Sequence, residues 1–186
     1  MTFEEMKQLP PDKQKALYER LKAARHKGKT TVYSATYGVG APKLARELGV
    51  PEREAKALLD AYWRRNWAIR AFSENAKVRN ISGQSWIYNP VSKFWYSLRF
   101  DKDRWSTLNQ STGTYVFDTW IMHVLSKRKQ MTAQFHDEGV WEIKKGFREK
   151  AEQLLRWAME ETNKKLNLNV KINIGVDFGD NYGVIH

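Results

Sequence analysis

A long helical pattern begins near the N-terminus. Pro10-Pro11-Asp12 is typical of a helix start, because proline fits the first helical turn and loses no hydrogen bond there. Apolar residues follow at helical spacing. They are Ala16, Leu17, Leu21 and Ala24. Because Gly38, Gly40 and Pro42 disfavour its continuation, the sequence predicts one long helix that ends within the stretch RHKGKTTVYSATYG, residues 25–38.

Further elements are marked by glycine, proline and residue spacing. A short helix, PKLARELG, is expected to end at Gly49, and a longer one to run from Pro51 through Trp67. The aromatic, alternating residues 81–100 predict a β-hairpin or two short strands around Asn89-Pro90. We expect Asp103 to cap the helix that follows.

The last third of the chain adds the remaining elements. TAQFHDEGVWEI has two short apolar runs about an acidic turn and predicts a second hairpin. A helix around residues 147–159 and a final strand, VKINIGVDFG, come after it. This order predicts an α+β fold whose β layer is built mainly from the last third.

Composition limits the class of protein. The 186 residues suffice for one ordinary domain or two small lobes. The absence of cysteine excludes disulfides and thiolate metal sites, and fits a reducing compartment. The charged, proline-broken N-terminus is unlike a signal peptide, and no apolar run approaches the roughly 20 residues that span a bilayer. We therefore expect a cytoplasmic protein with no membrane partner.

The charge points to a polyanionic partner. Lys and Arg outnumber Asp and Glu by 32 to 21, a formal net charge of +11, and Trp, Tyr and Phe each occur eight times. Nucleic acid binding uses such basic and stacking side chains. A basic face that is merely solvated is the alternative, and charge alone leaves both open.

A four-residue repeat stands within the predicted long helix. Arg25, Lys29, Tyr33 and Tyr37 follow one another at intervals of four. On a helix each step turns about 40° and rises about 6 Å, so the four side chains form a row some 18 Å long. A helix beginning near Arg25 would add its positive end to the cations. The row suits a ligand with phosphate first and base second. The alternative is an exposed basic turn followed by two core tyrosines.

The pattern R-x-x-x-K-x-x-x-Y-x-x-x-Y-G resembles motif B of the family A (Pol I-like) DNA polymerases, in the O helix of the fingers. The following stretches continue the resemblance in family order. PKLARELGVPEREAKALLDAYWRRN resembles the next fingers helices, STLNQSTGTYVFDTWI a palm helix, FHDEGVWEI motif C, and GDNYGVIH the C-terminus of the phage branch. The resemblance covers residues from about 20 to 186. It implies a helical fingers-like subdomain, 1–103, and the C-terminal half of a palm with antiparallel sheet and helices, 104–186.

The resemblance implies roles for the row. Arg25 and Lys29 would hold the triphosphate of the incoming dNTP, and Lys29 would also protonate the leaving pyrophosphate. Tyr33 would stack beside the sugar and base of that nucleotide. Tyr37 would lie beside the templating position on the DNA.

The palm stretches match further family residues. Gln110 matches a residue that reads the minor groove, and His136 one that contacts the primer end. Asp137 matches one of two aspartates that hold the catalytic Mg²⁺ pair, with Glu138 as an accessory carboxylate. There is an alternative for each of these stretches. Asp-Glu-Gly is also a common sequence in hairpin turns, and a glutamine in the middle of a helix usually faces solvent.

One family motif is missing. Only 24 residues precede Arg25, and none resembles the D-x-S-x-x-E-L-R of motif A, which carries the other metal-binding aspartate. Met1 and the family-like ending favour a natural gene product. We therefore expect the C-terminal piece of a split bacteriophage polymerase, acting in the host cytoplasm and active only with a second chain that carries motif A. Its DNA ligand would be primer-template. A split also predicts exposed apolar surface where the missing strand would pack.

Other hypotheses remain. A non-catalytic DNA-binding module derived from a polymerase would bind primer-template without a nucleotide. The four histidines, His26, His123, His136 and His186, lack zinc-like spacing. Trp63 and Trp67 are expected in a core or interface rather than as a base-stacking platform. The run Lys127-Arg128-Lys129 is interpreted as a solvated helix end.

Overall fold

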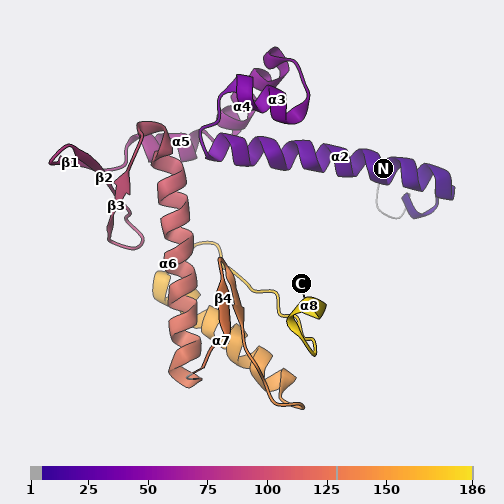
Figure 1. Ribbon diagram of the computed structural model, residues 1–186, viewed down its shortest axis with the longest axis vertical. Helices are drawn as coiled ribbons and strands as arrows, with labels where there is room; N and C mark the ends of the chain where they lie inside the picture. The colour runs from indigo at the N-terminus through magenta and orange to yellow at the C-terminus, as the bar shows by residue number, and fades with distance from the viewer. Residues whose placement is uncertain (1–5, 129, 186) are drawn as a thin grey trace. The chain divides into compact units, whose positions relative to one another are not determined.

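The computed structural model describes residues 6–128 and 130–185 (Figure 1). The chain divides into two compact units, Met1–Ile87 with Ser97–Leu108 and Tyr88–Tyr96 with Asn109–His186. Helices and two small sheets make up the described part, which confirms the predicted α+β class. Within that part, none of the helices combines the length and apolar character that a membrane span requires.

Four helices build most of the first unit. They are α2 (Pro11–Thr36), α3 (Ala41–Leu48), α4 (Glu52–Arg65) and α5 (Trp67–Glu74). The predicted start of α2 is confirmed, with proline in its first turn. The helix ends as predicted, because Gly38 adopts a left-handed φ of 66° that glycine tolerates best. Gly49, with a φ of 64°, ends α3 in the same way.

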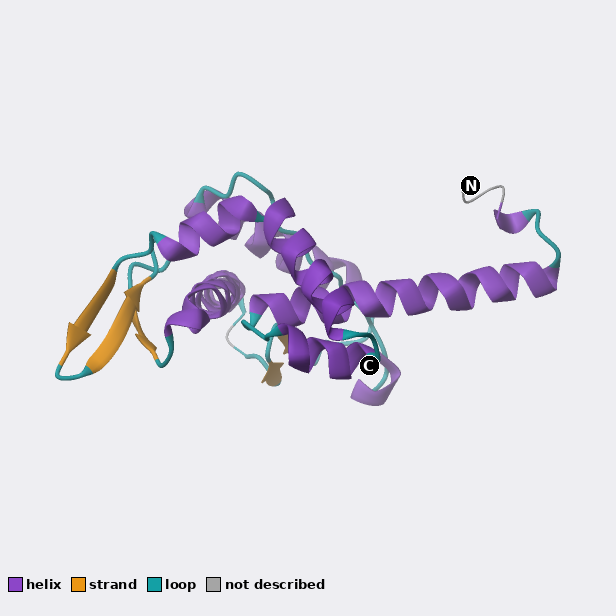
Figure 2. Ribbon diagram, turned by 90° about the horizontal axis from the view of Figure 1, so that it is seen from above, coloured by secondary structure: helices purple, strands orange, loops and turns teal. Residues whose placement is uncertain are grey.

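The apolar core of the first unit lies between α3 and α4. Leu44, Ala45 and Ala55 form its buried centre. The end of α2 packs on these helices, and Figures 1 and 2 show the N-terminal part of α2 extending away from them. Of the α2 residues, all of which the structure describes, the buried ones are Thr31, Ser34 and Ala35. Ser34 Oγ donates a hydrogen bond to Glu47 Oε2 of α3 at 3.0 Å. The helix is therefore held at its C-terminal end.

The predicted helix from Pro51 through Trp67 is interrupted. Asn66 leaves the helical region, with φ −106° and ψ 34°, and its Nδ2 donates to the Tyr62 carbonyl at 2.8 Å. The side-chain amide shares this carbonyl with the Asn66 backbone N–H, which bonds it at 2.9 Å, at the residue where α4 ends and α5 begins. Trp67 is 70% exposed, so it lies outside the core, and the other part of the expectation, that it lies in an interface, stays a prediction.

The predicted hairpin in residues 81–100 is part of a larger sheet. Its strands are β1 (Val78–Ile81), β2 (Gln84–Tyr88) and β3 (Trp95–Leu98), in the order β1-β2-β3. The loop around Asn89-Pro90 joins β2 to β3 as expected. Strand β1 was not predicted. It pairs antiparallel with β2, and Ser82 and Gly83 form the turn between the two strands. Both residues have a positive φ, as tight hairpin turns require.

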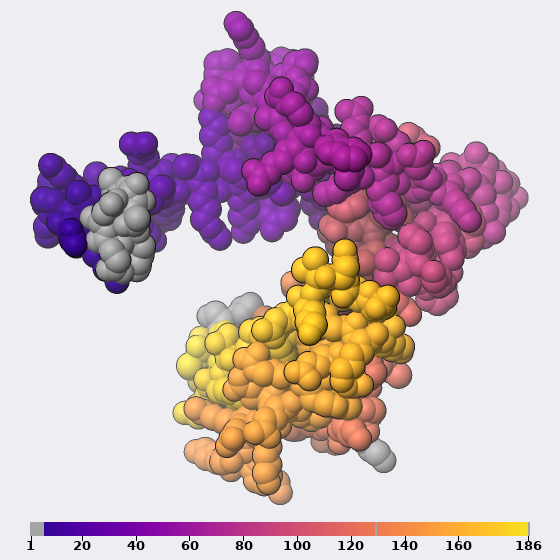
Figure 3. Space-filling model, turned by 180° about the vertical axis from the view of Figure 1, so that it is seen from behind, coloured from indigo at the N-terminus to yellow at the C-terminus, as the bar shows by residue number. Residues whose placement is uncertain are grey.

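The remaining elements complete the chain. They are the 3-10 turn η1 (Asp101–Asp103), α6 (Arg104–Lys127), β4 (Ala133–Phe135), β5 (Glu138–Val140), α7 (Arg148–Leu166) and α8 (Tyr182–Ile185). The predicted hairpin in TAQFHDEGVWEI is confirmed as the antiparallel pair β4–β5. Figure 3 shows the orange and yellow residues of the second unit packed together. Its buried core joins α6 to α7 through Trp120, Ile121, Val124, Ala158 and Met159.

The final strand predicted in residues 170–179 is absent. All of these residues are described, and none is paired in a sheet. The side-chain amide of Asn163 in α7 instead makes the two hydrogen bonds that a neighbouring strand would make to Ile172. Its Nδ2 donates to the Ile172 carbonyl at 2.8 Å, and its Oδ1 accepts from the Ile172 N–H at 2.9 Å. The expectation that the last third supplies most of the β structure is also wrong, because the larger sheet spans residues 78–98.

Candidate functional site

The row on α2 faces solvent. Arg25 and Lys29 are exposed, Tyr33 is 53% exposed and Tyr37 is 46% exposed. The Lys29 ammonium lies 5.6 Å from the centre of the Tyr33 ring, within the range of a cation–π contact. The alternative in which the two tyrosines are core residues is therefore wrong. Two cations and two aromatic rings are thus exposed along one side of this helix and its C-terminal end.

The opposite face of α2 fixes the direction of the row. Thr31, Ser34 and Ala35 are buried there, and Lys27 pairs with Glu54 of α4. Since successive residues on a helix are 100° apart, anchoring this face turns the row outward. Tyr37 follows the last helical residue, and its N–H still bonds the Tyr33 carbonyl at 3.0 Å.

The positive end of the α2 dipole does not add to the positive charge around Arg25. Helix α2 begins at Pro11, so Arg25 lies in the helix interior, about four turns from its positive end. The field of a helix terminus falls off within its first turn. The expectation that a helix beginning near Arg25 adds to the site is wrong, and the positive charge there comes from side chains.

The sequence His136-Asp137 forms the tip of the β4–β5 hairpin. Phe135 pairs with Glu138 in the strand register, which leaves His136 and Asp137 as the two turn residues. His136 has a φ of 48°, a left-handed conformation that a tight turn requires at this position. The side chains of both turn residues are exposed, whereas Glu138 is half-buried. The hairpin thus presents the Asp137 carboxylate to solvent.

A tryptophan supports the hairpin from the core side. Trp141 follows β5 and packs edge-on against Trp120 of α6, with ring centres 5.6 Å apart. Both rings belong to the apolar cluster between α6 and α7. The position of the turn is therefore set by packing against that core.

The C-terminal segment also reaches the hairpin. The Tyr182 ring lies 5.5 Å from that of Phe135, and its hydroxyl hydrogen-bonds the Glu138 carboxylate. Partial burial and the negative charge of Glu138 raise the pKa of Tyr182 above its ordinary value of 10.0. Sequence reasoning missed this residue. It stands in GDNYGVIH, but no spacing links that stretch to the hairpin.

Gln110 lies on the exposed surface of α6, in the second unit. The neighbouring Ser111 and Thr112 accept hydrogen bonds from the side-chain amide of Asn89, at 2.7 and 2.9 Å. Asn89 is fully buried, and its Oδ1 also accepts from the Val91 N–H at 2.8 Å. This buried amide joins the β2–β3 loop to the part of α6 that carries Gln110. Sequence reasoning placed Asn89 in a turn and missed this second role.

The predicted residues fall into two sets. Those of the row belong to the first unit, and Gln110 and the hairpin residues 136–138 belong to the second. Among the described residues no three His, Asp or Glu side chains are grouped so as to hold a metal. The Asp137 and Glu138 oxygens are nonetheless the hard donors that Mg²⁺ prefers, and Mg²⁺ commonly uses only one or two protein carboxylates. Lys129 and His186 lie outside the described residues.

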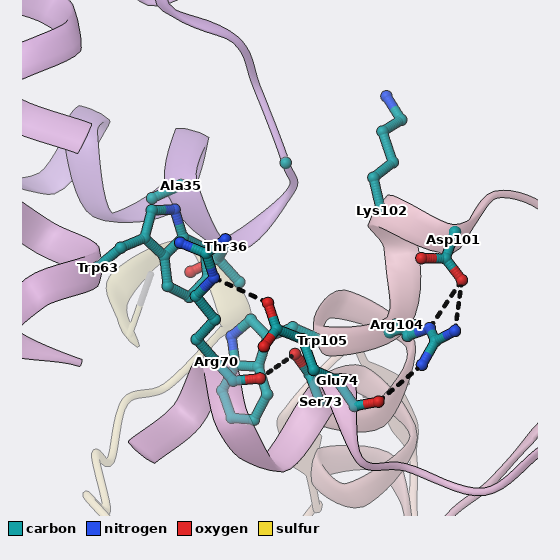
Figure 4. A pocket seen from close by; sticks show the side chains of 11 residues that line it. Ala35, Thr36, Trp63, Arg70, Ser73, Glu74, Asp101, Lys102, Arg104 and Trp105 are labelled. Atoms are coloured by element: carbon teal, nitrogen blue, oxygen red, sulfur yellow. Dashed lines mark hydrogen bonds and ion pairs between the residues drawn. The ribbon is translucent and has the colours of Figure 1, made fainter. Parts of the chain in front are cut away.

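Sequence reasoning also missed a cavity of about 640 Å³ in the first unit, beyond the end of α2. Figure 4 shows two indoles, Trp63 and Trp105, among charged side chains. Arg104 pairs with Asp101 and donates to the Glu74 carbonyl at 2.9 Å (Figure 4). The wall is thus a set of ion pairs around aromatic faces, and no periodic pattern in the sequence joins these residues.

No protein-family model matches the chain. The chain is 25% identical over 166 residues to the thermostable DNA polymerase I of Thermus filiformis, an alignment that covers 82% of this chain and 20% of that protein. It is 25% identical over 172 residues to the thermostable DNA polymerase I of Thermus aquaticus, covering 85% of this chain and 20% of that one. The chain therefore spans about a fifth of the length of these curated relatives.

A solved structure has a similar fold. The POL domain of Pol1 from M. smegmatis, in complex with DNA primer-template and dNTP, matches with a TM-score of 0.59 and 18% sequence identity. The match covers 74% of this chain and 27% of that one. Together with the sequence likeness, it supports the resemblance to a C-terminal portion of a family A DNA polymerase.

Proposed function

We propose that the chain is the C-terminal part of a phage-type family A DNA-directed DNA polymerase. The observation that carries the proposal is the outward row Arg25, Lys29, Tyr33 and Tyr37, whose opposite face is buried. The exposed His136-Asp137 turn of the second unit is a second, independent observation that supports the proposal. In this proposal residues 1–103 act as fingers and residues 104–186 as half of a palm.

The row would bind the incoming dNTP. Arg25 and Lys29 would hold its triphosphate through charge-assisted hydrogen bonds, and Tyr33 would stack beside its sugar and base. Tyr37, one turn further along, would lie beside the templating base. Because Lys29 is a mobile point charge with three donors, it suits a phosphate whose charge rises as the reaction proceeds.

The reaction is nucleotidyl transfer. The primer 3′-hydroxyl gives up its proton to water, its oxygen forms a bond to the α-phosphorus of the dNTP, and the bond from that phosphorus to the pyrophosphate oxygen breaks. Lys29 would give its proton to the departing pyrophosphate as a general acid. His136 would contact the primer end, and Gln110 would contact the minor groove of the new pair, where a fit can be sensed without regard to sequence.

Asp137 would hold Mg²⁺, with Glu138 as the accessory carboxylate. When bound, the metal ions lower the barrier by stabilising the attacking and leaving oxygens. A second aspartate is needed for a two-metal site, and none of the 186 residues resembles motif A. We propose that a separate chain supplies it, so that the active form is a heteromer in the host cytoplasm. The exposed apolar side chains of Val170, Ile172 and Val184 are available to such a partner.

Primer extension with Mg²⁺ tests the proposal. The chain is assayed alone and with a candidate partner that carries motif A. We expect incorporation only in the mixture, and a loss of more than about a hundredfold in Asp137→Asn, because removing a metal-binding charge removes transition-state stabilisation. Asp118→Asn, an exposed change on α6, is the matched control and should retain activity. Full activity in Asp137→Asn would show that the metal assignment is wrong.

The alternative is a non-catalytic module that binds primer-template. The basic charge of +11 favours salt-dependent binding in either case. Fluorescence anisotropy with and without dNTP separates the two functions. A polymerase should bind primer-template more tightly when the complementary dNTP is present. A binding module should have the same affinity for primer-template with each of the four dNTPs and without any dNTP.

A further inference from the structure

We infer that Tyr182 is a positioning residue that clamps the base of the His136-Asp137 turn. The clamp itself involves only the fold of the second unit and does not depend on any activity. Its consequence for catalysis rests on the proposed function, in which Asp137 is a metal ligand. Nothing in the family resemblance singled out this tyrosine.

One side chain contacts both strands of the hairpin. The Tyr182 ring lies 5.5 Å from the Phe135 ring, at an interplanar angle of 34°, and its hydroxyl bonds the Glu138 carboxylate. Phe135 and Glu138 are partners in the β4–β5 register and directly flank the turn. Tyr182 therefore links the last residue before the turn to the first residue after it.

The hairpin needs such a contact. Strands β4 and β5 have three residues each and form a sheet of two strands. An isolated two-stranded hairpin is marginally stable in water. Trp141 packs on the core side at the far end of β5, but the turn residues are exposed. Tyr182 supplies the contact at the turn itself.

The segment that carries Tyr182 is folded. The Arg148 guanidinium lies 5.6 Å from the centre of the Phe178 ring, which attaches the segment to α7. A Cβ on Gly179 would come within 2.8 Å of Ile185, so the chain turns back on itself through a position that only glycine fits. The Val184 N–H closes this turn by bonding the Asn181 carbonyl at 3.2 Å.

The hydroxyl also gives the Glu138 carboxylate a hydrogen-bond partner on the C-terminal segment. A hydrogen bond to a carboxylate is directional and stronger than a neutral one. It holds Glu138 toward the C-terminal segment and fixes the backbone beside Asp137. The Asp137 carboxylate then projects from a turn whose two flanking residues are both in contact with Tyr182. A metal-binding side chain requires this kind of pre-organisation.

Hydrogen–deuterium exchange on the full chain tests the clamp. Tyr182→Phe removes only the hydroxyl, and Tyr182→Ala removes the ring as well. We expect amide exchange in residues 133–140 to rise about ten- to a hundredfold in Tyr182→Phe, as loss of a hydrogen bond to a charged group predicts, and further in Tyr182→Ala. Tyr96→Phe, which loses a hydroxyl bond to Ser92 Oγ at 3.0 Å in the same unit, is the matched control. Unchanged exchange in Tyr182→Phe overturns the clamp.

Steady-state kinetics on the reconstituted polymerase test the consequence. Tyr182→Phe should lower kcat severalfold and leave the KM for dNTP within twofold, because the row on α2 is intact. A raised KM with unchanged kcat overturns the positioning role. If the unsubstituted chain incorporates no nucleotide with any partner, the proposed function fails and the catalytic consequence fails with it. The exchange measurement still decides the clamp in that case.

Discussion

Gly139 and the indole of Trp141 are in such close contact that a side chain between them has no space. A Cβ on Gly139 would come within 2.4 Å of Cη2 and 2.7 Å of Cζ3 of that ring. The ring is held edge-on against Trp120, so it cannot move without disturbing the core of the second unit. The glycine next to Glu138 is therefore required by packing.

Gly139→Ala should destabilise the protein. Overpacking of this kind costs about 1–3 kcal/mol, and the change should lower the midpoint of chemical denaturation. Gly113→Ala on α6 is the matched control, because nothing lies within 4 Å of the Cβ added there. In a helix interior that change should stabilise by about 0.5–1 kcal/mol. Equal midpoints for the two variants would contradict the close contact.

Gly38→Ala should cost more than Gly49→Ala. Both glycines end a helix with positive φ, 66° and 64°, so both substitutions introduce backbone strain of about 1 kcal/mol. At Gly38 the new Cβ would also lie 3.3 Å from the Lys102 carbonyl oxygen, whereas nothing lies within 4 Å at Gly49. Urea denaturation of the two variants measures the difference. A larger loss for Gly49→Ala would show that the Lys102 contact has no cost.

Asn89→Ala should destabilise the second unit by about 3 kcal/mol, because two hydroxyls and a backbone N–H lose their bonds to a buried amide. Thermal unfolding measures the loss. Asn75→Ala removes one exposed amide bond, Nδ2 to the Ala71 carbonyl at 2.8 Å, and should cost less than about 1 kcal/mol. If the two variants unfold alike, the Asn89 network does not stabilise the fold.

Lys29→Ala should slow nucleotide incorporation far more than it weakens binding of primer-template. This follows from the proposed general-acid role, which acts only in the transition state. Single-turnover incorporation and anisotropy measure the two effects. Lys13→Ala removes the same charge from the other side of α2 and should change neither strongly. Parallel losses of rate and affinity in Lys29→Ala would make Lys29 a DNA-backbone contact instead.

Tyr182 should titrate at higher pH than an ordinary tyrosine. Its pKa is raised in the folded state by partial burial and by Glu138. A raised pKa means that the stabilising contact is complete below the ordinary value of 10.0 and is lost as the pH rises through the folded value. The difference in phenolate absorbance between the unsubstituted chain and Tyr182→Phe should show one group with a midpoint above 10.0. A midpoint at or below that value would contradict the contact with Glu138.

Local signals predicted the helix ends well. Proline at the start of α2 and glycine at the ends of α2 and α3 act through φ and through backbone donors, which depend only on nearby residues. The β4–β5 turn was predictable for the same reason. The outward direction of Tyr33 was not, because burial of the opposite face depends on helices that come later in the chain.

Three asparagines and a tyrosine account for much of what the sequence did not predict. Asn66 divides a helix, Asn163 takes the place of a strand partner for Ile172, and Asn89 joins a loop to α6. Tyr182 reaches a hairpin more than forty residues earlier, as its contact with Phe135 shows. The Asn66 bond is local, to the carbonyl four residues earlier, whereas each of the other three side chains contacts a group that folding brings near. Hydrophobic periodicity carries no information about such bonds.

The one-ended attachment of α2 makes the helix a lever. From Thr31, the first buried residue of the helix, to Pro11 the helix extends about 30 Å, whereas Lys29 is about 3 Å and Arg25 about 9 Å from Thr31. A tilt of about 10° at the anchor would displace the far end by about 5 Å, Arg25 by about 1.5 Å and Lys29 by about half an ångström over these lengths. Lys29 and Tyr33 thus sit at the fulcrum. A force on the N-terminal part of α2 would therefore displace Arg25 and leave Lys29 and Tyr33 almost in place.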